Sequence, residues 1–345
     1  MRGPRFESRP TPWIPHGCNA LNAQSRPCSP AATWEVSCQL DTKIWPAYAL
    51  MMRVPEPSAV LQLLKPITWF APMWAFGCGV VSSGFSAAAR WNMVLAGIAL
   101  AGPLVCATSQ AVNDWYDRDV DAINEPNRPI PSGRIPGRWG FYIACLWTIL
   151  SLAWAWSLGK WVLGAAIVGL GLAWVYSAPP MRLKQNGWWG NSAVALAYEG
   201  LPWFTGAAVM AASLPDLRII AIALLYSLGA HGIMTLNDFK SIDGDRRLGV
   251  RSLPVQLGVK RAVRLACVVM AAPQIIVIGL LVAWGRPAYA AAVVVLLIGQ
   301  LALMPRLLAN PSEKAAAYNA TGTTLYVLGM LASAFALRSV GMGGP

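Results

Sequence analysis

Charged side chains are scarce in this sequence. Of its 345 residues only 12% are Asp, Glu, Lys or Arg, and 56% are hydrophobic, whereas an average soluble domain has about 25% charged residues. Histidine is nearly absent, with two residues, and the seven cysteines form no CxxC pair. These shortages exclude an ordinary soluble enzyme, and they indicate neither a disulfide framework nor a zinc site.

Long uncharged stretches take up most of the chain. Eight of them lie between successive charged residues: 66–89, 91–113, 139–159, 161–181, 219–237, 265–285, 287–305 and 315–337. A ninth stretch, 185–215, is interrupted only by Glu199. Each is long enough to cross a bilayer, which takes ~17–25 residues. We therefore predict an all-α, multi-pass membrane protein with about nine transmembrane helices.

The basic residues alternate from loop to loop. All but five of the 27 Lys and Arg residues fall in the N-terminal segment or in the even-numbered loops between the predicted helices. The five on the other side are Arg90, Lys160, Arg218, Arg286 and Arg338. The positive-inside rule then places the N-terminus and the even-numbered loops in the cytoplasm. The net charge of +12 is thus a sign of topology, and no nucleic-acid partner is expected.

Residues 1–54 differ from the rest of the chain in composition. The first 50 are rich in Pro, Ser and Asn, and they contain no apolar core long enough for a signal peptide. We expect a disordered extension over 1–54 and a membrane domain over 55–340. Since Met51 and Met52 precede the first ordered stretch, translation starting there would account for the extension. A transit peptide is the weaker alternative because the segment contains acidic residues.

Acidic residues are concentrated in two short segments on the predicted cytoplasmic side. Eight of the fifteen lie there: Asp114, Asp117, Asp119, Asp121 and Glu125 in one, Asp238, Asp243 and Asp245 in the other. Residues 113–121 match residues 237–245 without a gap, because Asn, Asp, an aromatic residue and two later Asp residues coincide. This match indicates an internal repeat, in which the ends of the second and sixth helices are equivalent.

The spacing of these acids suits a metal ion. On a helix, Asp114, Asp117 and Asp121 lie within about 60° of one another, and Asp119 points away. The same spacing groups Asp238, Ser241 and Asp245. Three carboxylates on one face repel one another unless a cation lies between them, and Mg²⁺ binds few carboxylates together with substrate phosphates. The alternative, that these are solvated loop acids, is weakened because two clusters match.

Basic residues near the acids are candidates for binding a diphosphate. We predict this role, with Tyr176 beside them, for Arg128, Arg182, Lys184, Lys240 and Arg246. Arg128 stands out because the prolines that follow it fix the direction of the backbone. Topology alone accounts for Arg134, Arg138, Lys260, Arg261 and Arg264.

The NDxxDxxxD pattern at 113–121, paired with a second Asp-rich loop, resembles the UbiA-like superfamily of intramembrane prenyltransferases over residues 55–340. The strings NDWYDRDVDAINEPNRPIPSGRIPGRWG at 113–140 and TLNDFKSIDGDRRLGVRSLPVQLGV at 235–259 look like its chlorophyll synthase branch, particularly the bacteriochlorophyll synthase members. The resemblance implies nine helices in a bundle around a central cavity, and a bacterial inner, photosynthetic membrane. It also implies that Asn113, Asp114, Asp117, Asp121, Asp238 and Asp245 are catalytic, and that the five aspartates among them bind Mg²⁺.

The activity implied by this branch is transfer of a geranylgeranyl or phytyl group from its diphosphate to the propionate carboxylate of bacteriochlorophyllide or chlorophyllide. Mg²⁺ and basic side chains would stabilise the leaving diphosphate. The acceptor carboxylate is already nucleophilic at neutral pH, so no strong base is needed. Ser241 departs from the Asp that quinone-forming relatives often carry. We therefore expect fewer protein ligands for a second metal and leave Asp243 off the metal face.

Three residues are candidates for contact with the acceptor. Trp115 adjoins Asp114, and His231 lies about a turn and a half before Asn237. Glu199 is the sole acid within an apolar stretch, where an unpaired charge costs at least ~2–3 kcal/mol, so it is expected to face the bundle cavity. A structural, hydrogen-bonded role is the alternative for both Glu199 and His231.

Other functions remain as alternatives. A quinone-precursor or haem prenyltransferase would share the metal site but use a different acceptor, and the string at 113–140 argues against it. A divalent-cation transporter would place its acids at mid-bilayer, whereas these lie at one face. The sequence leaves open the choice between geranylgeranyl and phytyl donors and between the two pigments.

Overall fold

The structure is a computed structural model that describes residues 54–338. The predicted extension over 1–54 and the start at Met51 or Met52 therefore lie outside the described residues. Within 54–338 the chain is helical, and its only β-type pairing is an isolated bridge between Asn186 and Arg251. The all-α prediction is confirmed.

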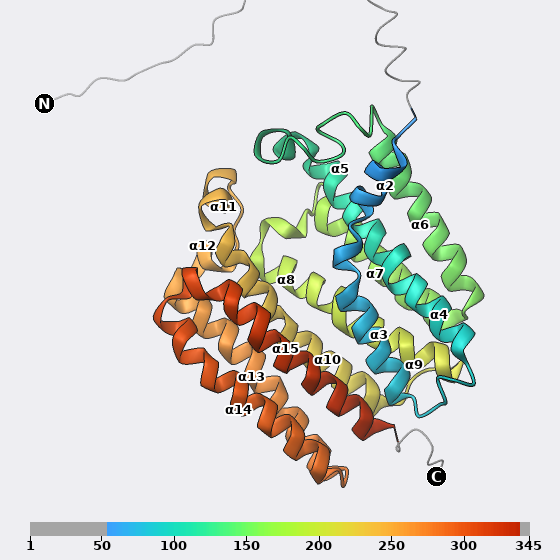
Figure 1. The fold of residues 1–345 in the computed structure, drawn as a ribbon, viewed down its shortest axis with the longest axis vertical. Helices are drawn as coiled ribbons and strands as arrows, with labels where there is room; N and C mark the ends of the chain where they lie inside the picture. Colours follow the sequence, from blue (N-terminus) through green and yellow to red (C-terminus); the bar gives the residue numbers. More distant parts are fainter. Residues whose placement is uncertain (1–53, 339–345) are drawn as a thin grey trace, which may run out of the picture. The chain divides into compact units, whose positions relative to one another are not determined.

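Helices follow one another with short connections (Figure 1). In chain order they are α2 (Pro57–Leu64), η1 (Pro66–Thr68), α3 (Phe70–Ser82), α4 (Trp91–Ala99), η2 (Leu100–Cys106), α5 (Ala107–Asn124), α6 (Trp139–Ser157), α7 (Lys160–Ser177), η3 (Leu183–Gln185), α8 (Gly187–Ala195), η4 (Leu196–Gly200), α9 (Leu201–Ala211), α10 (Leu217–Asn237), η5 (Asp238–Lys240), α11 (Ile242–Leu248), α12 (Leu253–Leu257), α13 (Val259–Ala283), α14 (Pro287–Ala309) and α15 (Pro311–Leu337).

Seven helices in the described part of the chain are long and apolar enough to cross a membrane. They carry large exposed apolar side chains such as Trp156, Ile298 and Val295, which suit contact with lipid. The predicted count of nine is not established by these dimensions. The 13 residues of α3 fall short of the span length, and the stretch 187–211 is divided into α8, η4 and α9.

Two helical stretches contain a π-helical segment. η2 joins α4 to α5 and contains Pro103, and η4 joins α8 to α9. A π turn frees backbone carbonyls, and neighbouring helices satisfy two of them: Trp147 Nε1 donates to the carbonyl of Pro103 at 3.1 Å, and Ser227 Oγ donates to that of Ala195 at 2.8 Å. Such segments commonly occur at functional sites, where they displace side chains from the regular helical position.

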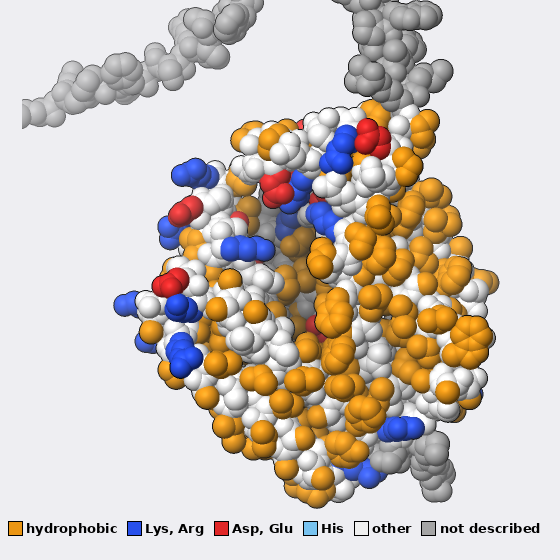
Figure 2. Space-filling model, viewed as in Figure 1, with side chains coloured by type: hydrophobic (Ala, Val, Ile, Leu, Met, Phe, Trp, Pro, Cys, Tyr) orange, Lys and Arg blue, Asp and Glu red, His pale blue; other side chains and the backbone are white. Residues whose placement is uncertain are grey.

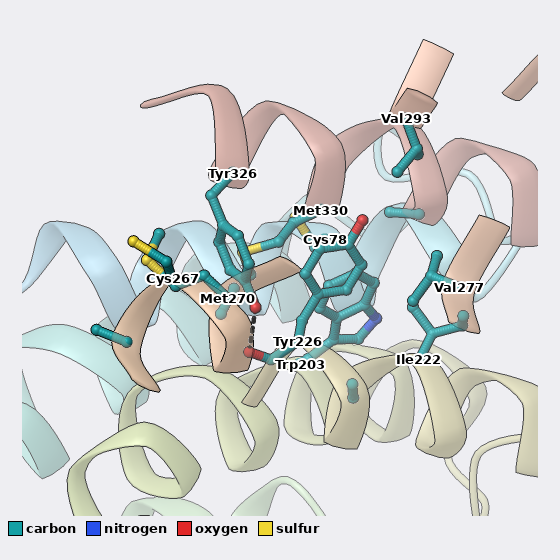
Figure 3. Close-up of a cluster of buried hydrophobic side chains, with 14 of the residues drawn as sticks. Cys78, Trp203, Ile222, Tyr226, Cys267, Met270, Val277, Val293, Tyr326 and Met330 are labelled. Atoms are coloured by element: carbon teal, nitrogen blue, oxygen red, sulfur yellow. Dashed lines mark hydrogen bonds between the residues drawn. The ribbon is translucent and has the colours of Figure 1, made fainter. Parts of the chain in front are cut away.

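An aromatic cluster joins three helices of the bundle (Figure 3). The ring of Trp203 on α9 stacks on Tyr226 of α10 with centroids 5.7 Å apart, and Tyr226 meets Tyr326 of α15 edge-on at 5.3 Å. The hydroxyl of Tyr326 donates to the carbonyl of Tyr226, and the Tyr226 and Ser333 hydroxyls lie 2.9 Å apart. All three rings are fully buried, so this cluster packs α9, α10 and α15 against one another.

The loop after α5, the connection from α7 to α8, and α11 with α12 all lie at one end of the bundle (Figure 1). They are the second, fourth and sixth loops of the prediction, and the second and sixth carry the two acidic segments. Their shared position agrees with the alternation of basic residues.

The two matching acidic segments differ in backbone structure. α5 continues through the first segment to Asn124, whereas α10 ends at Asn237 and is followed by a 3₁₀ turn and by α11. The expectation of one helical face for Asp238, Ser241 and Asp245 is therefore wrong. The break falls at Ser241, and Gly244 lies inside α11.

α3 and α9 cross with their backbones in contact. A Cβ atom at Gly79 would lie 2.0 Å from the carbonyl oxygen of Trp203, whereas a Cβ at Gly77, on the same helix, meets nothing within 4 Å. We expect Gly79→Ala to lower the thermal midpoint in detergent, because a backbone oxygen cannot move aside and overpacking costs ~1–3 kcal/mol. Gly77→Ala is the matched control and should be neutral or slightly stabilising. Equal midpoints for the two variants would contradict this crossing.

Candidate active site

A largely apolar cavity of about 660 Å³ opens among the helices. Its wall is formed by residues of η1, α3, η2, α5, α7, α8, η4, α9, α10 and α15. Three predicted site residues line it: Asn113, Tyr176 and Glu199. Figure 2 shows the hollow with acidic and basic side chains gathered around its rim and apolar side chains over much of the face below. The charged groups thus lie at one end of an apolar chamber.

Asp114 is the most deeply buried acid of the first segment, at 2% exposure. Its Oδ1 accepts from Lys65 Nζ at 2.6 Å and from Arg128 Nη1 at 3.4 Å. Its Oδ2 is buried and has no hydrogen-bond partner among the described residues. One oxygen is therefore neutralised, and the other is left free for a ligand.

Arg128 connects the acids of α5 with the loop that follows. Its Nη1 donates to Asp121 at 2.8 Å, and its other nitrogens hold Glu125 at 2.6 and 2.8 Å. The loop folds back through backbone bonds from Arg128 N to the Glu125 carbonyl and from Ile135 N to the Pro129 carbonyl. The guanidinium of Arg128 is thus directed toward the acids of α5.

Asp117 meets a second pair of basic residues. Lys184 Nζ lies 2.6 Å from both carboxylate oxygens of Asp117, and Arg182 Nη2 lies 3.2 Å from Oδ1. Burial lowers the pKa of Lys184, although Asp117 beside it acts in the opposite direction. Asn113 Nδ2 donates to Asp117 at 3.1 Å, and the side chain of Asn113 also borders the cavity. Asn113 therefore connects Asp117 with the wall of the chamber.

The second acidic segment is held by polar, uncharged partners. Asp238 Oδ2 accepts from Asn191 Nδ2 at 3.0 Å, and Asp245 Oδ2 accepts from Ser241 Oγ at 3.0 Å. The side chain of Asp243 is 88% exposed and lies 3.8 Å from Arg246. Its exposure agrees with the expectation that Asp243 points away from the acids of the site.

The basic residues of the second segment do not join those of the first. Lys240 and Arg246 are exposed and border a separate small pocket beside Asp243. In contrast, Arg128, Arg182 and Lys184 all contact acids of α5. The structure thus brings together three of the predicted diphosphate-binding side chains around α5, with Tyr176 on the nearby cavity wall.

Trp115 and His231 are absent from the part of the cavity wall that the described residues form. The ring of Trp115 packs against that of Phe141 with centroids 5.8 Å apart. The guanidinium of Arg118 lies 4.3 Å from the centre of the Trp115 ring. His231 Nδ1 lies 3.1 Å from Ser192 Oγ, and its ring is 6.0 Å from that of Trp188. Of the three acceptor candidates, Glu199 alone borders the chamber.

Sequence reasoning missed two residues of the site. Lys65 contacts Asp114, and Asn191 contacts Asp238. Lys65 precedes Pro66 and adopts a left-handed φ of 46° between α2 and η1. Its position just before the first apolar stretch was visible, but it could not be told apart from the other basic residues of the N-terminal segment. Asn191 carried no signal, because it lies inside an apolar stretch without a motif.

The donor chemistry of the site fits Mg²⁺. Carboxylates from α5 and from the segment after α10 would supply hard oxygen ligands, and the unpartnered Oδ2 of Asp114 is a buried oxygen of that kind. Within 54–338 no three His, Cys, Asp or Glu side chains converge as a ready-made metal cage. The acids of α5 instead pair with Lys and Arg, which are the groups that a diphosphate would engage.

The chain matches the model of the UbiA prenyltransferase family over residues 66–336. It is 60% identical to the bacteriochlorophyll synthase 33 kDa chain of Cereibacter sphaeroides, covering 83% of this chain and 95% of that protein. It is 39% identical to the chloroplastic chlorophyll synthase of Arabidopsis thaliana, covering 80% of this chain and 73% of that protein.

Its fold is similar to that of a UbiA homologue from Archaeoglobus fulgidus solved with GPP and Mg²⁺. The TM-score is 0.62 at 22% identity, over 78% of this chain and 99% of that one. The apolar helices and these matches identify an integral, multi-pass membrane protein. The chain belongs to the UbiA prenyltransferase family, in the branch of its chlorophyll and bacteriochlorophyll synthases.

Proposed function

We propose that this prenyltransferase is a bacteriochlorophyll synthase. It transfers a geranylgeranyl or phytyl group from its diphosphate to the propionate carboxylate of bacteriochlorophyllide and forms an ester. The observation that carries the proposal is the cluster of acids and cations around α5 at one end of an apolar chamber. The identity to bacteriochlorophyll synthases supports the choice of acceptor.

The cations of the site suit a diphosphate. Lys65, Arg128 and the pair Arg182 and Lys184 come from three different segments and reach the acids of α5 within 3.4 Å. We propose that they bind and orient the diphosphate, since charge-assisted bonds to phosphate oxygens are strong and directional. Lys240 and Arg246 remain proposed contacts from the second segment.

Asp114, Asp117, Asp121, Asp238 and Asp245 would hold Mg²⁺, with Asn113 holding Asp117 in place. The bound metal would neutralise charge that develops on the leaving diphosphate. The two acidic segments lie at the same end of the bundle (Figure 1), which permits both to face one substrate.

The chamber itself supports transfer to a carboxylate. Its wall consists mainly of Ala, Leu, Val and aromatic side chains, which would surround the hydrocarbon chain and exclude water from the positive charge that develops on the allylic carbon. Neither His nor Lys lines it among the described residues. The chamber therefore offers no strong base, and a carboxylate acceptor, nucleophilic without deprotonation, requires none.

The setting is proposed to be the inner, photosynthetic membrane of a bacterium, with the charged end of the bundle in the cytoplasm. The alternation of basic residues supports that orientation. A divalent-cation transporter is disfavoured because the clustered acids lie at one end, whereas Glu199 stands alone on the cavity wall.

The reaction can be tested directly. Membranes containing the protein are incubated with Mg²⁺, geranylgeranyl diphosphate and either bacteriochlorophyllide or chlorophyllide, and the pigments are separated by chromatography. We expect the esterified bacteriochlorophyllide to form faster than the chlorophyllide ester, and neither to form in the presence of a chelator. Prenylation of an aromatic quinone precursor, with neither pigment esterified, would overturn the proposal.

The acids of α5 provide a matched mutant series. We expect Asp114→Ala, Asp117→Ala and Asp121→Ala each to reduce kcat by at least about 100-fold, because each removes charge stabilisation from the leaving group. Asp119→Ala is the control, since its side chain is 84% exposed and meets only Arg118 at 3.6 Å. Initial rates at saturating substrates measure the effect. Similar losses in all four variants would contradict the assigned face.

The cations should act mainly on the donor. We expect Lys65→Met and Lys184→Met to raise the KM for geranylgeranyl diphosphate by about tenfold or more, which corresponds to one lost charge-assisted bond. Lys314→Met serves as the control because Lys314 is half-exposed and pairs with its neighbour Glu313. An unchanged KM in both site variants would remove these lysines from the diphosphate site.

A further inference from the structure

Three side chains on the cavity wall carry buried polar atoms without a hydrogen-bond partner among the described residues. These atoms are Oε2 of Glu199, Oδ1 of Asn319 and Oγ1 of Thr323. Buried polar groups in folded proteins are nearly always paired, because an unpaired one costs free energy. Three exceptions that border one chamber indicate a partner that the protein chain does not itself provide.

Asn319 and Thr323 form one face of α15. They are four residues apart, so they lie one turn above the other on the side of the helix that borders the chamber. Asn319 Nδ2 donates to Asn237 Oδ1 at 2.9 Å, which fixes its amide and leaves Oδ1 as a free acceptor. The neighbouring Thr321 and Thr324 hydroxyls bond to carbonyls of their own helix at 2.9 and 2.7 Å, whereas the Thr323 hydroxyl makes no such bond.

Glu199 borders the chamber from the π-helical segment η4. It is only 7% exposed, and no Lys or Arg side chain in the described residues forms an ion pair with it. Burial without a counter-charge favours the neutral form of such an acid, whose hydroxyl can donate. The three residues thus offer one acceptor and two hydroxyl groups, all uncharged.

The donor substrate has no use for these groups. A prenyl diphosphate has polar atoms only in its diphosphate, which belongs with the cations and acids of α5, and the rest of it is hydrocarbon. The reacting carboxylate of the acceptor does not match either, because an anion beside neutral oxygen groups would lack a counter-charge. What matches is a neutral, oxygen-bearing substituent, such as a carbonyl on the rim of a tetrapyrrole.

We propose that Glu199, Asn319 and Thr323 form the subsite that recognises neutral oxygen substituents of the acceptor macrocycle. This inference rests on the proposed function, because it assigns the wall to the second substrate of that reaction. The subsite positions the ring by hydrogen bonds, while the propionate is left to reach the diphosphate end of the chamber. Bacteriochlorophyllide carries a ring acetyl carbonyl where chlorophyllide carries a vinyl group, so the two pigments are suitable probes.

Thr323→Val is the sharpest test, because it removes one hydroxyl and keeps the shape of the side chain. We expect it to raise the KM for bacteriochlorophyllide about fivefold and to leave the KM for geranylgeranyl diphosphate within twofold, as for one lost neutral hydrogen bond. Thr321→Val is the matched control: Thr321 is exposed, lies half a turn away and does not border the chamber, so both KM values should stay unchanged.

Glu199 gives a second, independent comparison. Glu199→Leu should raise the pigment KM about fivefold or more, whereas Glu199→Gln, which keeps a neutral donor and acceptor, should remain within twofold of the wild type. Equilibrium binding of bacteriochlorophyllide to the detergent-solubilised enzyme without prenyl diphosphate, followed by pigment fluorescence, should show the same order. This binding measurement reports acceptor recognition apart from turnover. The difference in binding between bacteriochlorophyllide and chlorophyllide should be smaller in Thr323→Val than in the wild type.

The outcomes separate the two proposals. A wild-type enzyme that esterifies neither pigment overturns the proposed function. An active wild type whose pigment KM and pigment binding are unchanged in both Thr323→Val and Glu199→Leu overturns the subsite and leaves the function standing. An equal rise in both KM values for Thr323→Val would also overturn the subsite, since it would mark a general disturbance of the cavity.

Discussion

Carboxylates at the border of an apolar chamber need opposite charges close by, and this requirement shapes one end of the molecule. Asp114, at 2% exposure, has Lys65 and Arg128 within ion-pair distance of one of its oxygens. To provide those cations, the chain must break after α2, fold the loop 125–138 back over α5, and turn between α7 and α8 to present Lys184 to Asp117. The same arrangement gathers the cations that a diphosphate requires.

The chamber depends on irregular helices. A regular α-helix cannot widen locally, whereas the π segments η2 and η4 shift side chains and place Cys106 and Glu199 on the cavity wall. Their displaced carbonyls are satisfied by Trp147 and Ser227 from neighbouring helices. Elsewhere the bundle is tight: Gly79 allows α3 to touch α9, and the stacked rings of Trp203 and Tyr226 fill the centre. Space is thus confined to where the substrates would lie.

Much of this architecture could be predicted from charge alone, because the bilayer excludes charged residues from spans of a fixed length. The shared face of the α5 acids was also predictable, since residue spacing determines which side chains lie on one side of a continuous helix. The prediction of one helical face for Asp238, Ser241 and Asp245 failed because α10 ends at Asn237 and a 3₁₀ turn follows. Helical spacing therefore does not apply across this segment. Lys65 was missed because its role depends on a tertiary contact with Asp114, 49 positions away. Local patterns cannot report such contacts.

The polar groups of the chamber are separated by kind. Ionised side chains gather at one end, around α5, whereas Glu199 and Thr323 provide uncharged oxygen atoms on the wall. In a low-dielectric space this separation matters, because a cation on the wall would attract the diphosphate to the wrong place and a free carboxylate there would repel it. Neutral groups can orient the second substrate without competing for the first. Under the proposed function the ester bond would form where the two kinds of polarity meet, near Asn113, which borders the chamber and contacts Asp117.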